Sequence, residues 1–119
     1  MADQTRQVDS EESWEQVNEL VRRRVSQGSN MTVSRYKFEP GGEFPLHKHE
    51  QEQVTVVLSG DVTMTVEDES HRLSPGDSII IAPNVLHRGS VGSRGAEVVG
   101  IVAPPRSDSS EINFVERNE

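Results

Sequence analysis

The chain of 119 residues contains no cysteine. Without thiols the protein cannot form a disulfide framework, a thiolate zinc finger, an iron–sulfur cluster or a cysteine nucleophile. Any bound metal must therefore be held by histidine, carboxylate or amide oxygen ligands. This exclusion directs attention to the four histidines of the chain, which are His47, His49, His71 and His87.

Positive charge and long hydrophobic runs are also scarce. Twelve Lys and Arg against twenty Asp and Glu leave a formal net charge of -8 at pH 7, which repels nucleic acid phosphates and anionic lipid surfaces. No apolar run approaches the roughly 20 residues of a membrane span. The polar, acidic start lacks the basic and then apolar layout of a signal peptide. These features argue against nucleic acid or membrane binding and predict a cytoplasmic protein.

Hydrophobic residues make up only 32% of the chain, so a single domain with a thin core is expected at this length. Residues 1–13 contain too little apolar surface to offset the entropy of ordering them. We therefore predict a flexible acidic tail at residues 1–13 and one folded domain at residues 14–119.

From Met31 onwards the sequence is typical of β-structure. Short runs rich in Val, Ile and Thr are separated by Gly, Pro, Ser and Asp at intervals of roughly eight to twelve residues. Residues 53–58 and 61–67 flank Ser59-Gly60 and predict a hairpin, and residues 78–82 are apolar enough for a central strand. The pattern predicts a small all-β sandwich or barrel with strands at residues 31–38, 53–58, 61–67, 71–73, 78–82, 85–89, 96–102 and 112–115.

The segment before Met31 allows two interpretations. Trp14, Val17, Val21 and Val25 are spaced three and four residues apart, which favours a helix. Val21 and Val25 also flank three consecutive arginines in a way that a strand tolerates.

Two histidines stand at a spacing that suits a shared ion. On an extended chain the rings of His47 and His49 project from one face. Gly41-Gly42 precede them in a loop, and His87 follows a second strand that Gly and Pro punctuate. Three neutral imidazoles suit Zn, Fe, Co or Ni with one oxygen ligand, and their metal affinity should fall below about pH 6.5. By itself a His-x-His pair is more often surface or packing chemistry than a pair of ligands. We expect His71, which lies in a polar segment, to be a surface residue.

Residues 41–60 and 75–91 carry a family resemblance. Gly41, five residues, His47-Lys48-His49, three residues, Gln53, six residues and Gly60 resemble the first motif of the cupin family, and the segment from Pro75 to His87 resembles its second. The resemblance implies a single-domain jelly-roll β-barrel with a divalent transition metal, such as Ni, Zn, Fe, Co or Mn. The ligands that it implies are His47, His49, Gln53 and His87.

Gln53 stands where most cupins have Glu. An amide oxygen leaves the full charge of the ion in place and makes a stronger Lewis acid than a carboxylate site would. In the alternative interpretation, Glu50 or Glu52 supplies the oxygen ligand. Strand alternation turns Glu52 to the face opposite Gln53, which disfavours that alternative.

A narrower resemblance covers about residues 14–108. The arginine-rich run, the segment around the histidine pair and Pro104-Pro105-Arg106 look like the small single-domain cupins related to the pectin-degradation protein KdgF. That resemblance implies linearisation of 4,5-unsaturated monouronates to open-chain keto acids, and a strand rather than a helix at residues 21–26. It also implies that Arg106 clamps the substrate carboxylate, although by residue type alone Arg106 could be a solvated arginine.

The chain departs from that group at two positions. An acidic and an aromatic residue are implied six and four residues before Arg106, where this sequence has Gly100 and Val102. Three functions are therefore considered: a non-redox enzyme acting on a small sugar acid, a metal-dependent dioxygenase of the quercetinase type, and a non-catalytic small-molecule-binding cupin. Gln53 counts against the dioxygenase, which usually keeps an acidic ligand. The expected partner is a small anionic molecule, and cupins commonly pair as homodimers.

Overall fold

The computed structural model describes residues 6–8, 10–106, 113 and 114. Within them lie a short 3₁₀ helix, η1, and nine strands. The elements are η1 (Glu11–Ser13), β1 (Glu15–Asn18), β2 (Val21–Gln27), β3 (Thr32–Phe38), β4 (Glu43–Lys48), β5 (Glu52–Val66), β6 (Glu69–Leu73), β7 (Ser78–Ile81), β8 (His87–Ala103) and β9 (Asn113–Phe114). The tail predicted at residues 1–13 falls partly on residues 1–5 and 9, which lie outside the described residues.

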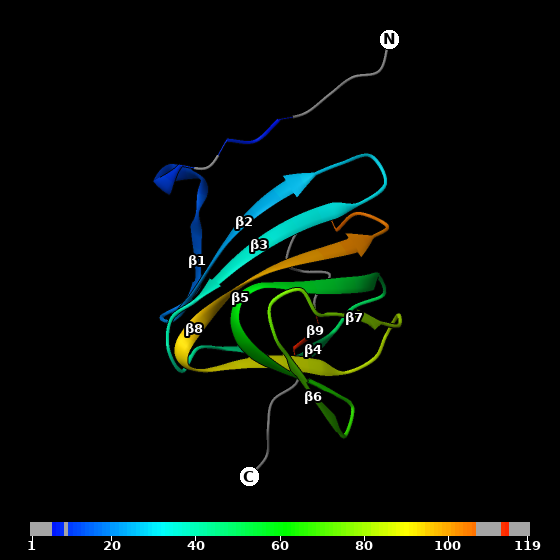
Figure 1. Ribbon diagram of the computed structural model, residues 1–119. Coiled ribbons are helices and arrows are strands. Elements are labelled where there is room, and N and C mark those ends of the chain that lie inside the picture. The colour runs from blue at the N-terminus through cyan, green and yellow to red at the C-terminus, as the bar shows by residue number, and fades with distance from the viewer. Residues whose placement is uncertain (1–5, 9, 107–112, 115–119) are drawn as a thin grey trace.

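Two long strands, β5 and β8, run through both halves of the sheet (Figure 1). In one half the strand order is β1-β2-β3-β8-β5-β7, and in the other it is β9-β4-β8-β5-β6. The halves bend toward each other and enclose the interior of the molecule (Figure 1). The predicted all-β jelly-roll fold is confirmed.

The bend of β5 and β8 depends on two glycines. Gly60 and Gly95 have φ angles of 74° and 69°, which disfavour other residues. A Cβ atom at Gly60 would lie 2.2 Å from the carbonyl oxygen of Gly95. The register between the strands also shifts on both sides of Gly60. The predicted hairpin at Ser59-Gly60 is therefore wrong, because the glycine forms a corner within one continuous strand rather than a turn between two.

Other strand predictions need smaller corrections. Residues 85–89 and 96–102 lie almost wholly within the single strand β8. Among the described strands β7 pairs only with β5, and Ile80 is 69% exposed, so the prediction of a central strand at residues 78–82 is wrong. Apolar composition misled the prediction because one face of this edge strand packs inward while the other remains open. Strand β9 pairs with β4, and residues 112 and 115 lie outside the described residues.

The ambiguous segment before β3 is extended. Strand β1 pairs with β2, and β2 pairs with β3 over its whole length, so the helical interpretation is wrong and the strand at residues 21–26 is confirmed. The spacing of Trp14 reflects packing outside the sheet, where its ring contacts cationic side chains of β2 and β3.

The core lies between the two halves and draws on both. Its largest contributors come from the inward faces of the strands and include Val21, Phe38, Phe44, Val57, Val62, Met64, Leu73, Ile81, Val91 and Val98. In β5 the alternation of Val62 and Met64 with threonines follows the half-buried pattern predicted for this segment.

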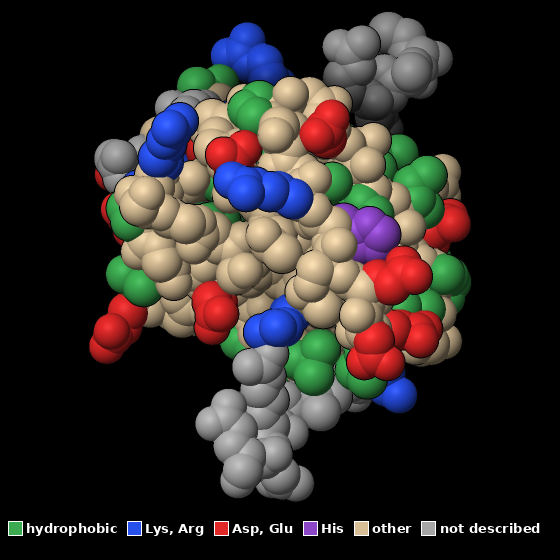
Figure 2. Space-filling view, turned by 60° about the horizontal axis from the view of Figure 1, so that its bottom comes forward, with side chains coloured by type: hydrophobic (Ala, Val, Ile, Leu, Met, Phe, Trp, Pro, Cys, Tyr) green, Lys and Arg blue, Asp and Glu red, His purple; other side chains and the backbone are tan. Residues whose placement is uncertain are grey.

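The surface shown in Figure 2 carries acidic and basic side chains separated by uncharged atoms. No continuous basic area is seen among the side chains coloured on that face. Among the described residues, no helix has the length and apolar character needed to cross a membrane.

Candidate metal centre

Three histidines meet at one end of the barrel interior. His47 lies near the end of β4, His49 follows two residues later, and His87 begins β8 directly opposite His47 in the strand register. One ring nitrogen from each lies within 4.8 Å of the others. All three side chains are buried, with exposed fractions of 6%, 1% and 1%. The spacing in the sequence thus corresponds to a cluster in space.

Backbone carbonyls fix the orientation of each ring. The Nδ1 atom of His47 lies 2.7 Å from the Pro45 oxygen, and the Nδ1 atom of His87 lies 2.9 Å from the Val85 oxygen. A carbonyl can only accept, so each Nδ1 carries the proton and donates it. The Nε2 atoms are left with free lone pairs, and His87 Nε2 is buried with no hydrogen-bond partner. Such rings, held by a second hydrogen bond, are typical of metal ligands.

Burial keeps the histidines neutral. Burial, and next to it the repulsion that a protonated His87 would exert, lowers the pKa of His47 to about 3. Burial is also the main cause that lowers the pKa of His87 to about 4, and it lowers the pKa of His49. Proton competition at His47 and His87 therefore begins well below the pH of about 6.5 expected for unperturbed imidazoles.

Gln53 lies beside the histidine cluster and could offer an oxygen to an ion bound there. Its Oε1 atom lies 2.9 Å from His49 Nε2, while its Nε2 atom donates to the Thr55 hydroxyl at 2.8 Å. His49 Nδ1 donates its proton to the Gln51 oxygen at 3.0 Å. In a neutral ring Nε2 then carries a lone pair, and this lone pair faces the Gln53 oxygen, which also has only lone pairs to offer. Ligands bound at right angles about 2.1 Å from one ion lie ~3 Å apart. Without an ion, a half-turn of the amide would let its nitrogen donate to His49.

The neighbouring charged residues lie outside the cluster. Lys48 is exposed, as its position between the two histidines predicts. Glu50 and Glu52 are also exposed, and the cluster found among the described residues contains no carboxylate. The alternative in which one of them supplies the oxygen ligand therefore has no support in the geometry. His71 is partly exposed in β6, next to Glu69.

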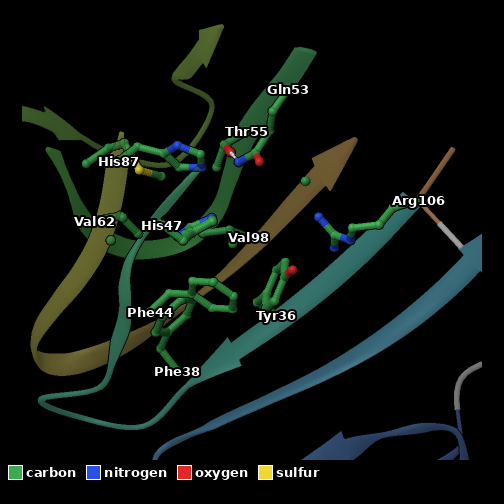
Figure 3. Close-up of a pocket in the computed structure, with 13 residues that line it drawn as sticks. Tyr36, Phe38, Phe44, His47, Gln53, Thr55, Val62, His87, Val98 and Arg106 are labelled. Carbon is green, nitrogen blue, oxygen red and sulfur yellow. Dashed lines mark hydrogen bonds between the residues drawn. The ribbon is translucent and has the colours of Figure 1, made fainter. Parts of the chain in front are cut away.

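A pocket opens beside the cluster (Figure 3). Its wall combines aromatic and aliphatic side chains with a few polar groups. The lining residues are Tyr36, Phe38, Phe44, His47, Gln53, Thr55, Val62, Met64, His87, Gly89, Val98, Gly100 and Arg106. A concave, mostly apolar site with a few convergent polar groups is typical of small-molecule binding.

Arg106 reaches this pocket from the segment after β8. Its side chain is drawn pointing toward the interior in Figure 3, and the residue is only 7% exposed. The backbone anchors it, because its N–H donates to the Thr32 hydroxyl at 2.8 Å and its oxygen accepts from Gln27 at 2.6 Å. The interpretation of Arg106 as a solvated surface residue is wrong.

The opposite wall contains a residue that the sequence reasoning missed. Tyr36 lines the pocket from the middle of β3. A Cβ atom at Gly100 would lie 3.7 Å from the Tyr36 ring, so the tyrosine adjoins the space that a side chain at position 100 would enter. Strand alternation could have identified Tyr36, because it lies two residues before Phe38 and therefore on the same, inward face of β3.

The family follows from a comparison that spans more than half of the chain. The family model described as the cupin domain matches residues 34–102. This chain belongs to the cupin family. The pectin degradation protein KdgF of Dickeya dadantii is 24% identical over 103 residues, which are 85% of this chain and 94% of that protein. H2HPP isomerase of Bacillus subtilis is 30% identical over 81 residues, which are 66% of this chain and 34% of that protein.

Solved cupin structures share the fold. KdgF from Halomonas sp. superimposes with a TM-score of 0.76 at 26% identity, covering 80% of this chain and 88% of that chain. An RmlC-like cupin from Shewanella frigidimarina gives a TM-score of 0.77 at 22% identity, covering 87% of this chain and 96% of that chain. This protein is thus a small cupin that resembles KdgF.

Proposed function

We propose that this cupin is a metal-dependent, non-redox enzyme that opens and isomerises an unsaturated uronate or a related small sugar acid. One observation carries the proposal: two rings of the three-imidazole cluster, His47 and His87, line the same pocket as Gln53 and the buried Arg106, and the cluster contains no carboxylate from the described residues. The likeness to two KdgF proteins supports it.

The histidines and Gln53 would hold a divalent transition metal. Such an ion, when bound, would supply Lewis-acid stabilisation of negative charge on a substrate oxygen. The buried neutral rings contribute no charge of their own, and the amide oxygen contributes none either. The apolar wall formed by Phe44, Val62 and Val98 limits water in the pocket, which strengthens every charge interaction within it.

Arg106 would bind the carboxylate of the substrate. Its guanidinium presents a planar fork of donors that matches a carboxylate in two parallel hydrogen bonds. The fixed backbone of Arg106 reduces the freedom lost on binding. A protein with a formal net charge of -8 can attract an anionic substrate only through a local positive field such as this one.

A non-catalytic binding cupin is the second candidate, because Gly100 offers no side chain to move a proton. A protein of this kind would hold the same anion between the cluster and Arg106 without turning it over. The dioxygenase is disfavoured, because the cluster lacks the acidic ligand usual in that type of site.

Turnover distinguishes these functions. The protein reconstituted with Zn²⁺ is mixed with 4,5-unsaturated galacturonate, and loss of the ultraviolet absorbance of the conjugated double bond is followed. The proposal predicts ring opening at least about 100-fold faster than the uncatalysed rate, with His87→Ala as the inactive control. Tight binding without turnover would favour the non-catalytic cupin, and oxygen consumption with a flavonol would favour the dioxygenase.

A further inference from the structure

The pocket wall opposite the histidines holds a group that can move a proton. Of the residues that line it, the histidines are committed to the cluster, and arginine does not release its proton in proteins. Thr55 is a far weaker acid than a phenol. Tyr36 is therefore the remaining side chain of the lining with acid–base chemistry.

The Tyr36 ring is held in place by its neighbours. It packs edge-on against Phe44, with ring centres 5.6 Å apart and an interplanar angle of 79°, and tilts against Phe38 at 6.3 Å. Aromatic pairs in this arrangement stabilise one ring orientation. Figure 3 shows the hydroxyl of this ring facing the side chain of Arg106.

Two cations face that hydroxyl. Arg106 approaches from the segment after β8. Arg23 is the residue of β2 that pairs with Tyr36 in the strand register, and its guanidinium lies beside the Tyr36 hydroxyl. Arg23 is itself held by Glu15, with 2.6 Å between Nε and the carboxylate. Positive charges near a phenol stabilise the phenolate that exists while its proton is on the substrate.

From this arrangement we propose that Tyr36 is the general acid of the reaction, and that Arg23 is its positioning residue. The inference rests on the proposed function and supplies the proton-transfer group that Gly100 and Val102 lack.

In the ring form of an unsaturated uronate, the hydroxyl on carbon 1 loses its proton to water, and the bond from carbon 1 to the ring oxygen breaks. The ring oxygen becomes a ketone on carbon 5. Tyr36 donates its proton to carbon 4 and regains one from water, so that atoms and charges balance.

Removal of one oxygen atom tests this role. Tyr36→Phe keeps the ring and its packing, so metal content and the binding of saturated galacturonate, measured by calorimetry, should not change. The value of kcat should fall about 100-fold or more, as general acid catalysis typically contributes 10²–10⁴-fold. The matched control is Val33→Thr, on the opposite face of the same strand, which should leave kcat unchanged.

The stereochemistry of deuterium incorporation at carbon 4 separates a catalytic role of Tyr36 from a purely structural one. In D₂O the wild-type protein should deliver deuterium to one face of carbon 4, and Tyr36→Phe should yield both stereoisomers. Arg23→Gln should reduce kcat by about 10-fold with little change in KM, while the stereochemistry is kept. Normal turnover and single-face labelling in Tyr36→Phe would overturn the role of Tyr36 and leave the proposed function intact. Absence of turnover in the wild-type protein would overturn both.

A second measurement covers the case in which Tyr36→Phe fails to fold. Tyr36 is the only tyrosine in the chain, so growth on fluorotyrosine changes this residue alone. Fluorine makes a phenol more acidic. At high pH kcat should fall as the phenol loses the proton that it must donate. In the fluorotyrosine protein this fall should occur at lower pH, and an unchanged pH dependence of kcat would contradict the proposal.

Discussion

The two sides of the pocket are built by different means. The proposed metal side consists of His47 on β4, His49 just after it, Gln53 on β5 and His87 at the start of β8, with backbone carbonyls orienting the three rings. The substrate side consists of Tyr36, Gly100 and Arg106, which come from β3, the far end of β8 and the segment after it. Two ligands of the first side stand two residues apart in the sequence, whereas the second side depends on the long-range pairing of β3 with β8 and on the contacts that hold Arg106 against β2 and β3.

The largest expected effect is loss of the metal. His87→Ala removes one ligand from the metal side and should weaken binding by at least about 100-fold, more than typical losses from second-shell changes. Elemental analysis of the purified protein checks this. His71→Ala, a change to a histidine outside the cluster, should retain full metal content. Equal occupancy in both variants would contradict the ligand assignment.

Breaking the corner between the two sides should have the next largest effect. Gly60→Ala adds a Cβ atom 2.2 Å from the Gly95 oxygen at a positive φ, and should cost about 3 kcal/mol of unfolding free energy. Gly76→Ala is the matched control, because its φ is also positive but no atom lies within 4 Å of the new Cβ. It should cost only about 1 kcal/mol. Denaturant unfolding that gives equal losses would show that the corner is not tightly packed.

On the substrate side, Arg106→Ala should change binding of the anion but not of the metal. Loss of hydrogen bonds to a charged group typically costs about 1.5–3 kcal/mol, which corresponds to a KM roughly 10- to 100-fold higher. Steady-state kinetics and elemental analysis on the same sample separate the two effects. Unchanged KM would leave Arg106 without a role in substrate binding.

The smallest effect concerns pH. Three unperturbed imidazoles would lose about sixfold in apparent metal affinity between pH 7.5 and 6.5. Because burial lowers the pKa of His47 to about 3 and of His87 to about 4, protons do not compete at these sites in that window. The affinity should change less than about twofold, and fall steeply only as the pH approaches 4. Isothermal titration with Zn²⁺ at several pH values checks this, and a sixfold loss would show that the rings are solvated.

Lower pH should also destabilise the metal-free fold. The folded pKa of His47 lies below its value in the unfolded chain, so the unfolded state binds more protons between about pH 6.5 and 3. Stability is therefore fully present above pH 6.5 and is lost as the pH falls through this window. Denaturant unfolding of the metal-free protein at pH 7 and pH 5 should show the decrease, and equal midpoints would contradict a buried, neutral His47.

The metal side could be predicted from the sequence because local spacing determines it. His47 lies near the end of β4 and His49 just beyond that end, so the two-residue spacing keeps their rings together, and the second motif contains His87. The long strands could not be predicted, because Ser59-Gly60 is compatible with a turn as well as with a corner, and only pairing with β8 decides between them. Tyr36 was missed because its approach to Gly100 and Arg106 depends on pairings between residues more than 60 positions apart.

The most direct test of the proposed function is a crystal structure of the metal-loaded protein soaked with a uronate, with anomalous scattering to identify the ion. We expect one ion bound by Nε2 of the three histidines and the oxygen of Gln53, a uronate carboxylate on Arg106, and carbon 4 facing the Tyr36 hydroxyl. An ion bound elsewhere, or a uronate that leaves Arg106 without a carboxylate contact, would contradict it.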